Sequence, residues 1–246
     1  MNAPTHSSPL GDPIAVPRTD PASWKARISE DRQRAVRLQT PAQRRITKIL
    51  VRRTRACGGI ALALTGSTAR GKRTSWSDLD YYVVGPRPHF VDLPEDLDVY
   101  ATQGPMDKLW EGDDFIQWTL LFGCILFDSG VLREVFEELI DSEVWPDPQR
   151  KLSQAIEASE LAASVLSLGD ADLAREQVSI ALSHVARWLL LKEHVFPLSR
   201  SELPAQLRQF GHQGLAEALE RSLSPSPTAN DLRSCLTLAS CLTAET

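Results

Sequence analysis

Three aspartates and a Gly-Ser turn are the residues in this sequence whose types and spacing could support chemistry. Asp78 and Asp80 flank Leu79 in a predicted strand, so both carboxylates lie on the same strand face. Two like charges on one face repel each other unless a cation lies between them. Gly66 and Ser67 precede them and form a tight turn whose free backbone N–H groups suit phosphate. The pattern predicts a divalent metal ion that carries a nucleotide.

A third carboxylate is expected on a neighbouring strand. In the run Leu97–Ala101, Asp98 alternates with apolar residues and would complete a metal site with the first two carboxylates. The run Val91–Leu93 has the same pattern around Asp92, but Pro94 follows it directly and shortens any strand there. We therefore prefer Asp98 as the third carboxylate and keep Asp92 as the alternative.

The elements that position these residues are predicted to form a mixed α/β half. Alternating or short apolar runs bounded by glycine predict strands at 60–64, 78–84, 97–101 and 124–127. Helical periodicity and capping signals predict helices at 24–38, 40–57, 113–122 and 131–142, with Thr40 as the N-cap of the second. A one-turn helix is expected at 68–71 with Ser67 as its cap, and a loop is expected around Gly104-Pro105.

The C-terminal half shows helical patterns alone, at 148–168, 170–193, 201–222 and 229–242. Apolar residues of the second helix follow an i, i+3, i+4 stripe that indicates a bundle core. We predict an α+β fold, with a small mixed sheet flanked by helices followed by a C-terminal helical bundle. The predicted boundaries are a flexible tail at 1–23, the α/β domain at 24–146 and the helical domain at 147–246.

The combined motif resembles the nucleotidyltransferase superfamily that includes DNA polymerase beta. Gly66-Ser67, ten intervening residues, Asp78-Leu79-Asp80 and the strand with Asp98 carry this resemblance over about residues 58–101. The length and the helical C-terminal half are most similar to the small nucleotidyltransferases that modify aminoglycoside and lincosamide antibiotics. The resemblance implies a magnesium-dependent enzyme with a nucleotidyltransferase fold in its α/β half. It would move a nucleoside monophosphate, AMP from ATP or the equivalent from another NTP, onto a hydroxyl group of a small molecule.

The resemblance also implies a role for each residue of the motif. The expected catalytic residues and metal ligands are Asp78, Asp80 and Asp98, of which Asp98 could accept the proton of the attacking hydroxyl. The expected nucleotide-binding residues are Gly66, Ser67, Arg70 and Lys72, with Arg73 as a further candidate. Members of the antibiotic-modifying group use an acidic residue of the helical half on the acceptor, and the candidates here are Glu157, Glu160 and Glu176. The sequence gives no basis for choosing among these three.

Charge and neighbouring side chains leave several interpretations open. The net charge is −5, yet residues 18–55 hold 12 Lys and Arg against 3 Asp and Glu, so the remainder is strongly acidic and would favour a cationic acceptor. Tyr82 shares the face of the aspartates and could line the nucleotide pocket or pack at its rim. His184 and His194 are expected to be structural.

Two other functions compete with small-molecule transfer. The basic segment is the one feature that favours a protein- or RNA-modifying nucleotidyltransferase of toxin–antitoxin type, but solvated amphipathic helices explain it as well. A non-catalytic nucleotide-binding relative is the other alternative. No signal peptide or membrane span is present, so we expect a cytoplasmic protein, and the cysteine spacing does not match a zinc site. Because the chain is acidic and its basic segment has no interleaved aromatic residue apart from Trp24, nucleic acid is not the expected partner. A monomer or a homodimer is expected.

Overall fold

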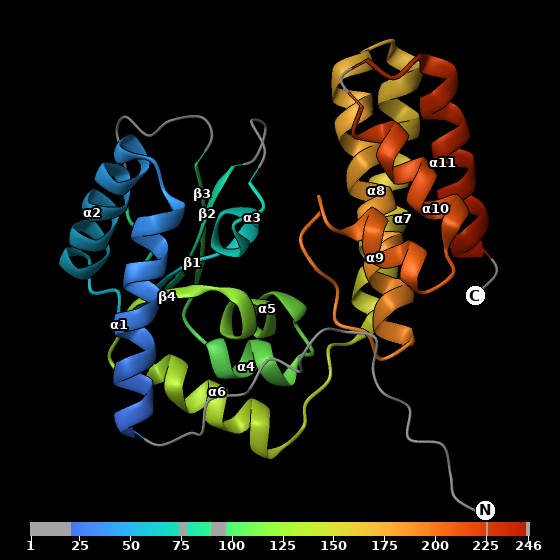
Figure 1. The fold of residues 1–246 in the computed structure, drawn as a ribbon. Coiled ribbons are helices and arrows are strands. Elements are labelled where there is room, and N and C mark those ends of the chain that lie inside the picture. The colour runs from blue at the N-terminus through green and yellow to red at the C-terminus, as the bar shows by residue number, and fades with distance from the viewer. Residues whose placement is uncertain (1–20, 74–77, 90–96, 225, 245–246) are drawn as a thin grey trace, which may run out of the picture.

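A computed structural model describes residues 21–73, 78–89, 97–224 and 226–244. The N-terminal half contains the helices α1 (Pro21–Leu38), α2 (Pro41–Ala56), α3 (Gly66–Arg70), α4 (Pro105–Trp110), α5 (Asp114–Phe122) and α6 (Val131–Asp141). Its strands are β1 (Ala61–Leu64), β2 (Leu79–Val84), β3 (Leu97–Thr102) and β4 (Cys124–Asp128). The C-terminal half consists of α7 (Pro148–Leu168), α8 (Ala171–Lys192), α9 (Leu203–Gln209), α10 (Gln213–Ser222) and α11 (Ala229–Ala244). Figure 1 shows the two halves side by side, with α11 on the side of the helical half away from the sheet.

The four strands form one mixed sheet in the order β3-β2-β1-β4. Strand β1 runs antiparallel to both of its neighbours, whereas β2 and β3 are parallel. Because alternate side chains point to opposite faces, the sheet separates two apolar layers. Tyr82 and Ala63 pack with residues of α4, α5 and α6 on one face, and Leu62 and Tyr81 pack with residues of α1, α2 and α3 on the other. The predicted α+β class with a small mixed sheet is therefore confirmed.

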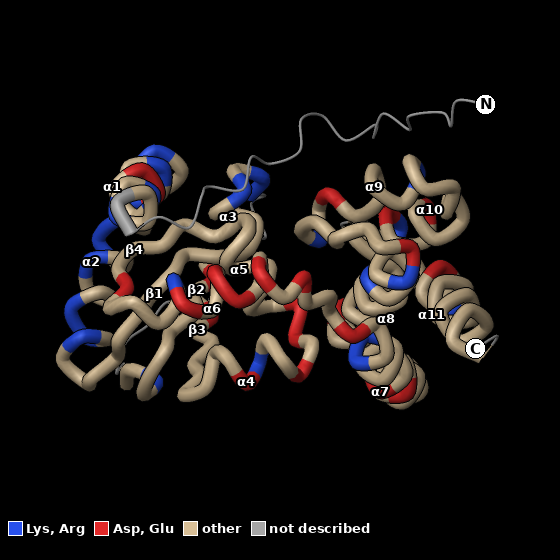
Figure 2. The backbone as a smooth tube through the Cα atoms, turned by 90° about the horizontal axis from the view of Figure 1, so that it is seen from below, with Lys and Arg blue, Asp and Glu red and all other residues tan. Residues whose placement is uncertain are grey.

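Arginine side chains tie α1 to the rest of the α/β half. Arg34 donates hydrogen bonds to the carbonyl oxygens of Ala69 (2.6 Å) and Phe122 (2.7 Å). Arg27 and Arg32 likewise donate to backbone carbonyls of α5 and β4. These guanidinium groups satisfy backbone acceptors near helix ends and on β4, so part of the basic segment has a structural role. Other Lys and Arg residues lie along α2 and α3 (Figure 2).

The helical half has an apolar core of its own, formed by residues of α7 to α11. Between α7 and α8, Gly169 adopts φ +80° as the C-cap and Asp170 accepts a hydrogen bond from the Leu173 N–H as the N-cap. These caps separate the two helices at the boundary predicted between residues 168 and 170. The α8 stripe predicted to be core is buried, as expected for a bundle.

The turn after β1 differs from the prediction in one respect. Helix α3 begins at Gly66 rather than at Thr68, so Ser67 lies inside its first turn and does not cap it. Thr65, the residue before the helix, has an extended backbone and makes no capping hydrogen bond through its side chain. The prediction of Ser67 as a helix cap is therefore wrong, because the chain enters the helix one residue earlier at a glycine.

Two further predictions are corrected in the helices. The single helix predicted at 201–222 is divided into α9 and α10 because Gly211 adopts φ +84°, a conformation that an α-helix does not accommodate. The loop expected around Gly104 is instead the start of α4. Pro105 occupies the first turn of this helix, where a backbone N–H would have no hydrogen-bond partner within the helix, so proline is tolerated there.

The two halves touch through side chains of both. The Trp145 indole N–H donates to the Leu191 carbonyl at 3.0 Å, and the rings of Phe122 and Phe196 lie 5.9 Å apart. No described helix combines the length and the apolar character that crossing a membrane requires. The four cysteines are free thiols, of which Cys124 and Cys235 are buried.

The buried carboxylate of Asp31 gives a prediction about the stability of this half. Asp31 is 6% exposed, accepts a hydrogen bond from the Ile125 N–H at 3.0 Å, and lies 3.6 Å from Arg27. Asp31→Ala should lower the free energy of unfolding by about 2–4 kcal/mol, because it leaves a buried N–H and a guanidinium without their acceptor. Urea unfolding measures this change. Glu30→Ala removes an exposed acid from the same helix and should change stability by less than about 0.5 kcal/mol; equal effects would contradict the assignment.

Candidate active site

The predicted motif residues meet at one end of the strands, where β1 ends and β2 begins. The Thr65 N–H donates to the Asp80 carbonyl at 2.9 Å, so the chain leaves β1 directly beside the second residue of β2. Gly66 follows with φ +64°, and a Cβ atom at this position would overlap with Asp80 Oδ2. The turn therefore approaches the Asp80 carboxylate as closely as a backbone can, and only glycine permits it.

Asp80 and Asp98 are neighbours across the parallel strands. The register pairs Asp80 with Asp98 and Tyr82 with Tyr100, so these four side chains share one sheet face. Asp78 lies immediately before β2 and is exposed. The competing candidate Asp92 lies outside the described residues. The structure thus brings two of the three predicted carboxylates into direct register, with the third at the entry to the same strand.

Electrostatics show that these carboxylates influence one another. Burial raises the pKa of Asp80 to about 6, and repulsion by the charges of Asp98 and then Asp78 contributes in the same direction. The positive charges of Arg200 and Arg187, both from the helical half, act against this rise. The ionised form of Asp80 is therefore disfavoured, and a bound cation would stabilise it.

Aromatic side chains close the other end of this face. The ring of Phe115, in α5, lies 5.7 Å from Tyr82 and 4.7 Å from Tyr100. Tyr82 is 4% exposed, and its hydroxyl has no hydrogen-bond partner among the residues that the structure describes. Tyr82 therefore packs in the apolar core on the face that carries the carboxylates, whereas the sequence placed it in the nucleotide pocket or at its rim.

The predicted phosphate ligand Arg70 is engaged with the helical half. Its guanidinium donates to both carboxylate oxygens of Glu202, at 2.9 and 3.3 Å, and lies 4.9 Å from the centre of the Phe122 ring. Burial alone would raise the pKa of Glu202, but the bonds from Arg70 and Ser199 outweigh it and hold the pKa below its usual value. Next to this pair, the Ser201 hydroxyl donates to the backbone carbonyl of Lys72 at 3.4 Å. Residues just before α9 are thus joined to α3.

Basic residues of the helical half face the carboxylates, and sequence reasoning missed them. Arg187 lies on α8 and is half-buried, whereas Arg200 is an exposed residue of the segment before α9. Burial lowers the pKa of Arg187, while the charge of Asp114 opposes that change. Neither arginine forms an ion pair or a hydrogen bond within the described ranges. A charged residue three positions after His184, beside the apolar stripe of α8, was the signal that could have identified Arg187.

A buried ion pair lies beside Arg187. Lys151, 8% exposed, places its Nζ 2.7 Å from Asp114 Oδ1, so α7 is joined to the start of α5. Burial lowers the pKa of Lys151 and the Asp114 charge acts against this. Burial, Arg187 and Lys151 together lower the pKa of His184 to about 3, so its imidazole is neutral at pH 7.

The remaining candidates are placed as follows. Ser67 is half-buried and its hydroxyl makes no hydrogen bond in the described part of the chain, while the Lys72 side chain is exposed. The three glutamates proposed for the acceptor are exposed on α7 and α8: Glu157, Glu160 and Glu176. Glu160 also lines a groove between α7 and α11. His194 is exposed and its ring lies 5.5 Å from that of Trp145.

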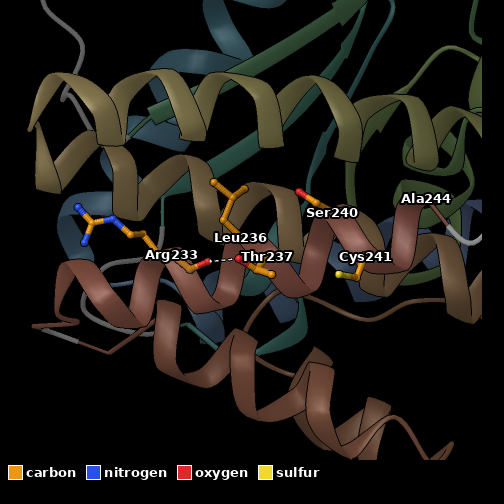
Figure 3. A pocket seen from close by; sticks show the side chains of 6 residues that line it. All are labelled: Arg233, Leu236, Thr237, Ser240, Cys241 and Ala244. Carbon is orange, nitrogen blue, oxygen red and sulfur yellow. Dashed lines mark hydrogen bonds between the residues drawn. The ribbon is translucent and has the colours of Figure 1, made fainter.

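A surface groove of about 540 Å³ runs along α11, away from the carboxylates (Figures 1 and 3). Its wall is one face of a single helix, with Arg233 and Cys241 among the residues shown in Figure 3. The wall contains no carboxylate or imidazole to serve as an acid or base, so the chemistry of this protein is expected at the sheet edge instead.

The carboxylates were tested for their fit to a divalent metal ion. Within the described residues, no three Asp, Glu, His or Cys side chains are already gathered closely enough to hold a metal. Burial, and then the charges of Asp98 and Asp78, raise the pKa of Asp80, so a cation bound beside it would favour its ionised form. Carboxylate oxygens are the ligands that magnesium prefers, so the donor set fits this ion after adjustment of the side chains.

Comparisons with known proteins give a family match and a similar solved structure. Residues 44–122 match the family model described as a nucleotidyltransferase domain, a segment that contains Gly66 and all three candidate aspartates. The crystal structure of a nucleotidyltransferase-like protein from Exiguobacterium sibiricum 255-15 is similar, with 17% identity, 79% of this chain and 74% of that chain covered, and a TM-score of 0.41. No curated protein sequence gave a significant match. The family match covers less than half of the chain and supports a nucleotidyltransferase domain in its α/β half.

The contact between Gly66 and Asp80 predicts the cost of a methyl group. Gly66→Ala should lower the free energy of unfolding by about 2–4 kcal/mol, since it adds a clash to the strain of a positive φ. Gly211→Ala is the matched control, because Gly211 has a positive φ with no atom within 4 Å of the added Cβ, and it should cost about 1 kcal/mol. In an Asp80→Ala background, the Gly66→Ala penalty should fall to that of the control; an unchanged penalty would contradict the contact.

The raised pKa of Asp80 predicts how stability depends on pH. Because its pKa is about 6 in the folded chain and 3.8 ordinarily, its contribution to stability is full below pH 3.8 and is lost as pH rises through 6. Asp80→Asn should therefore stabilise the protein without added metal by about 1–3 kcal/mol at pH 7.5, with no gain below pH 4. Urea unfolding at several pH values measures this difference. Asp141→Asn, an exposed substitution, should show no such pH-dependent gain.

Proposed function

We propose that this protein transfers a nucleoside monophosphate, AMP from ATP, to a hydroxyl group of a small molecule and releases pyrophosphate. The observation that carries the proposal is the pairing of Asp80 with Asp98 in register, with the Gly66 turn against Asp80. The match of residues 44–122 to a nucleotidyltransferase domain supports the same reaction class. Both observations concern the donor half of the reaction.

In the proposed reaction, the acceptor oxygen forms a bond to the α-phosphorus of the nucleotide. The bond between that phosphorus and the oxygen bridging to the β-phosphate breaks, and pyrophosphate leaves with the electron pair. Asp98 accepts the proton of the attacking hydroxyl on a carboxylate oxygen. Asp98 suits this role because its side chain is exposed on the edge strand β3, beside the buried Asp80.

The metal ion of the proposal is magnesium, held by Asp78, Asp80 and Asp98. When bound, it would neutralise charge on the phosphates and on the three carboxylates. Asp80 is fixed for this purpose by the close contact of its carboxylate with Gly66, so its oxygens are presented at the phosphate turn. Asp78 precedes β2 and Asp98 lies beside Asp80 on β3, so both belong to the same end of the strand pair.

Residues around α3 would hold the donor phosphates. Gly66 lets the backbone approach them, and Ser67 can add a hydroxyl hydrogen bond. Arg70 would contribute only after it exchanges Glu202 for a phosphate oxygen, since both of its bonds are now made to that carboxylate. Lys72 is exposed nearby, and its side chain makes no ion pair or hydrogen bond with another described residue.

The test of this function has a binding arm and a turnover arm. Wild-type protein should bind α,β-methylene ATP in the presence of magnesium, measured by isothermal titration calorimetry, and Asp80→Ala should weaken this binding at least about tenfold. With ATP labelled at the α-phosphate, label should pass to a member of a panel of hydroxylated compounds that includes aminoglycosides and lincosamides. Asp98→Asn should lower the rate by at least about 100-fold.

Asp141→Asn is the control for both arms, because it changes an exposed aspartate at the end of α6. The proposal is wrong if magnesium–nucleotide binding is absent, or if Asp80→Ala and Asp98→Asn transfer label as the wild type does. Label that appears on the protein itself or on RNA would also overturn transfer to a small molecule.

A further inference from the structure

A half-exposed tyrosine lies on the strand that carries the proposed base. Tyr100, in β3, is 47% exposed, and it follows Asp98 by two residues. Both side chains therefore point to the same face of the sheet, about 6.6 Å apart along the strand. The register pairs Asp98 with Asp80 and Tyr100 with Tyr82. The Tyr100 ring thus lies one step along the strands from the carboxylate pair.

Packing against a second ring holds Tyr100 in place. The ring centre of Phe115 lies 4.7 Å from that of Tyr100 and 5.7 Å from that of Tyr82, with both pairs tilted by 54°. Tilted pairs at these distances attract each other. The Tyr100 hydroxyl makes no hydrogen bond with another described residue, so ring packing rather than the hydroxyl sets the position of this side chain. The outcome is a fixed apolar surface, partly open to solvent, beside the carboxylates.

The geometry of phosphoryl transfer places the acceptor on the side of this ring. The donor phosphates are proposed at the Gly66 turn, which lies against Asp80 at the end where β2 begins. The attacking and leaving oxygens lie roughly in line through the phosphorus. With pyrophosphate leaving toward the turn, the acceptor enters from the opposite direction, which is further along β2 and β3. The next pair of residues on this face is Tyr82 and Tyr100, of which Tyr82 is buried.

The same geometry assigns the ring to the acceptor rather than to the nucleobase. The ribose is joined to the α-phosphorus through an oxygen that is neither the attacking nor the leaving atom. In the transition state this oxygen lies across the line of attack, so the nucleoside extends to the side of that line. Tyr100 lies along the line, beyond Asp98 as seen from the Gly66 turn.

We propose that Tyr100 forms an acceptor subsite that stacks against a sugar or cyclitol ring. The attacking hydroxyl must come within about 3 Å of the Asp98 carboxylate, while the rest of the acceptor covers the Tyr100 ring. A sugar or cyclitol ring presents hydroxyl groups at its edge and C–H groups over its face, so it meets both requirements. An open-chain polyol has no fixed face and loses more conformational freedom on binding. The inference rests on the proposed nucleotidyl transfer and names its acceptor class.

The first experiment compares acceptors in turnover. The ring compounds myo-inositol, methyl glucoside and kanamycin, and the open-chain polyol mannitol, are offered at equal concentration with magnesium and labelled ATP. Ring compounds should accept label in preference. Tyr100→Ala should raise their KM at least about tenfold while the KM for ATP stays constant, and Tyr100→Phe, which keeps the ring, should keep the wild-type KM. Trp110→Ala removes another exposed aromatic residue, 58% exposed on α4, and should leave both KM values unchanged.

Several outcomes would overturn the subsite. Equal or better transfer to mannitol would remove the requirement for a ring, and an unchanged KM in Tyr100→Ala would remove the residue. A loss in Tyr100→Phe as large as in Tyr100→Ala would show that the hydroxyl, and not the ring face, contacts the acceptor. A raised KM for ATP with an unchanged KM for the ring compounds would assign Tyr100 to the nucleobase.

The second experiment measures binding without turnover and separates the inference from the proposed function. Protein with magnesium and α,β-methylene ATP is mixed with methyl glucoside, and its aromatic protons are irradiated in saturation-transfer NMR. Saturation should reach the C–H protons of the sugar in the wild type and in Trp110→Ala, and should be lost in Tyr100→Ala. If nucleotide binds but Tyr100 makes no difference to this transfer, the subsite fails while nucleotidyl transfer stands. If nucleotide does not bind, the proposed function fails, and the same measurement on the protein alone still tests the subsite.

Discussion

The contact between Gly66 and the Asp80 carboxylate is the constraint on which the rest of the site depends. It requires β1 to end beside the start of β2, and it requires a backbone conformation that glycine adopts readily. The parallel pairing of β2 with β3 then places Asp98 beside Asp80. Burial of the Asp80 carboxylate, together with the charges of Asp98 and Asp78, raises its pKa, so a bound cation would stabilise its ionised form.

Charge is distributed unevenly between the two sides of this site. The sheet edge contributes carboxylates, and α8 contributes basic groups, among which Arg187 has no ion-pair partner in the described ranges. The basic N-terminal segment is used differently, because arginines of α1 satisfy backbone carbonyls of the sheet and its helices. The number and sign of the charged residues in the sequence therefore did not indicate which charged side chains lie at the candidate site and which have a structural role.

The strands, most helices and the motif could be predicted because their signals are local. Alternation around Asp80, glycine at the turn and capping residues such as Thr40 and Asp170 each act over a few residues. The division of α9 from α10 escaped prediction because one glycine outweighed a continuous helical pattern. Arg187 and Asp114 escaped because their importance arises from packing between elements more than 70 positions apart, which periodicity does not register. The same holds for the engagement of Arg70 by Glu202.

The pair between Arg70 and Glu202 has a consequence for where the site begins and ends. The motif lies entirely in the α/β half, which suggests a self-contained unit. However, α3 is joined to the segment before α9 by this pair and by the Ser201–Lys72 contact. An isolated α/β half would keep its carboxylates and lose both the counter-charges and the clamp on α3. We therefore expect the proposed transfer to require both halves, because loosening the contact between them would remove these groups from the candidate site.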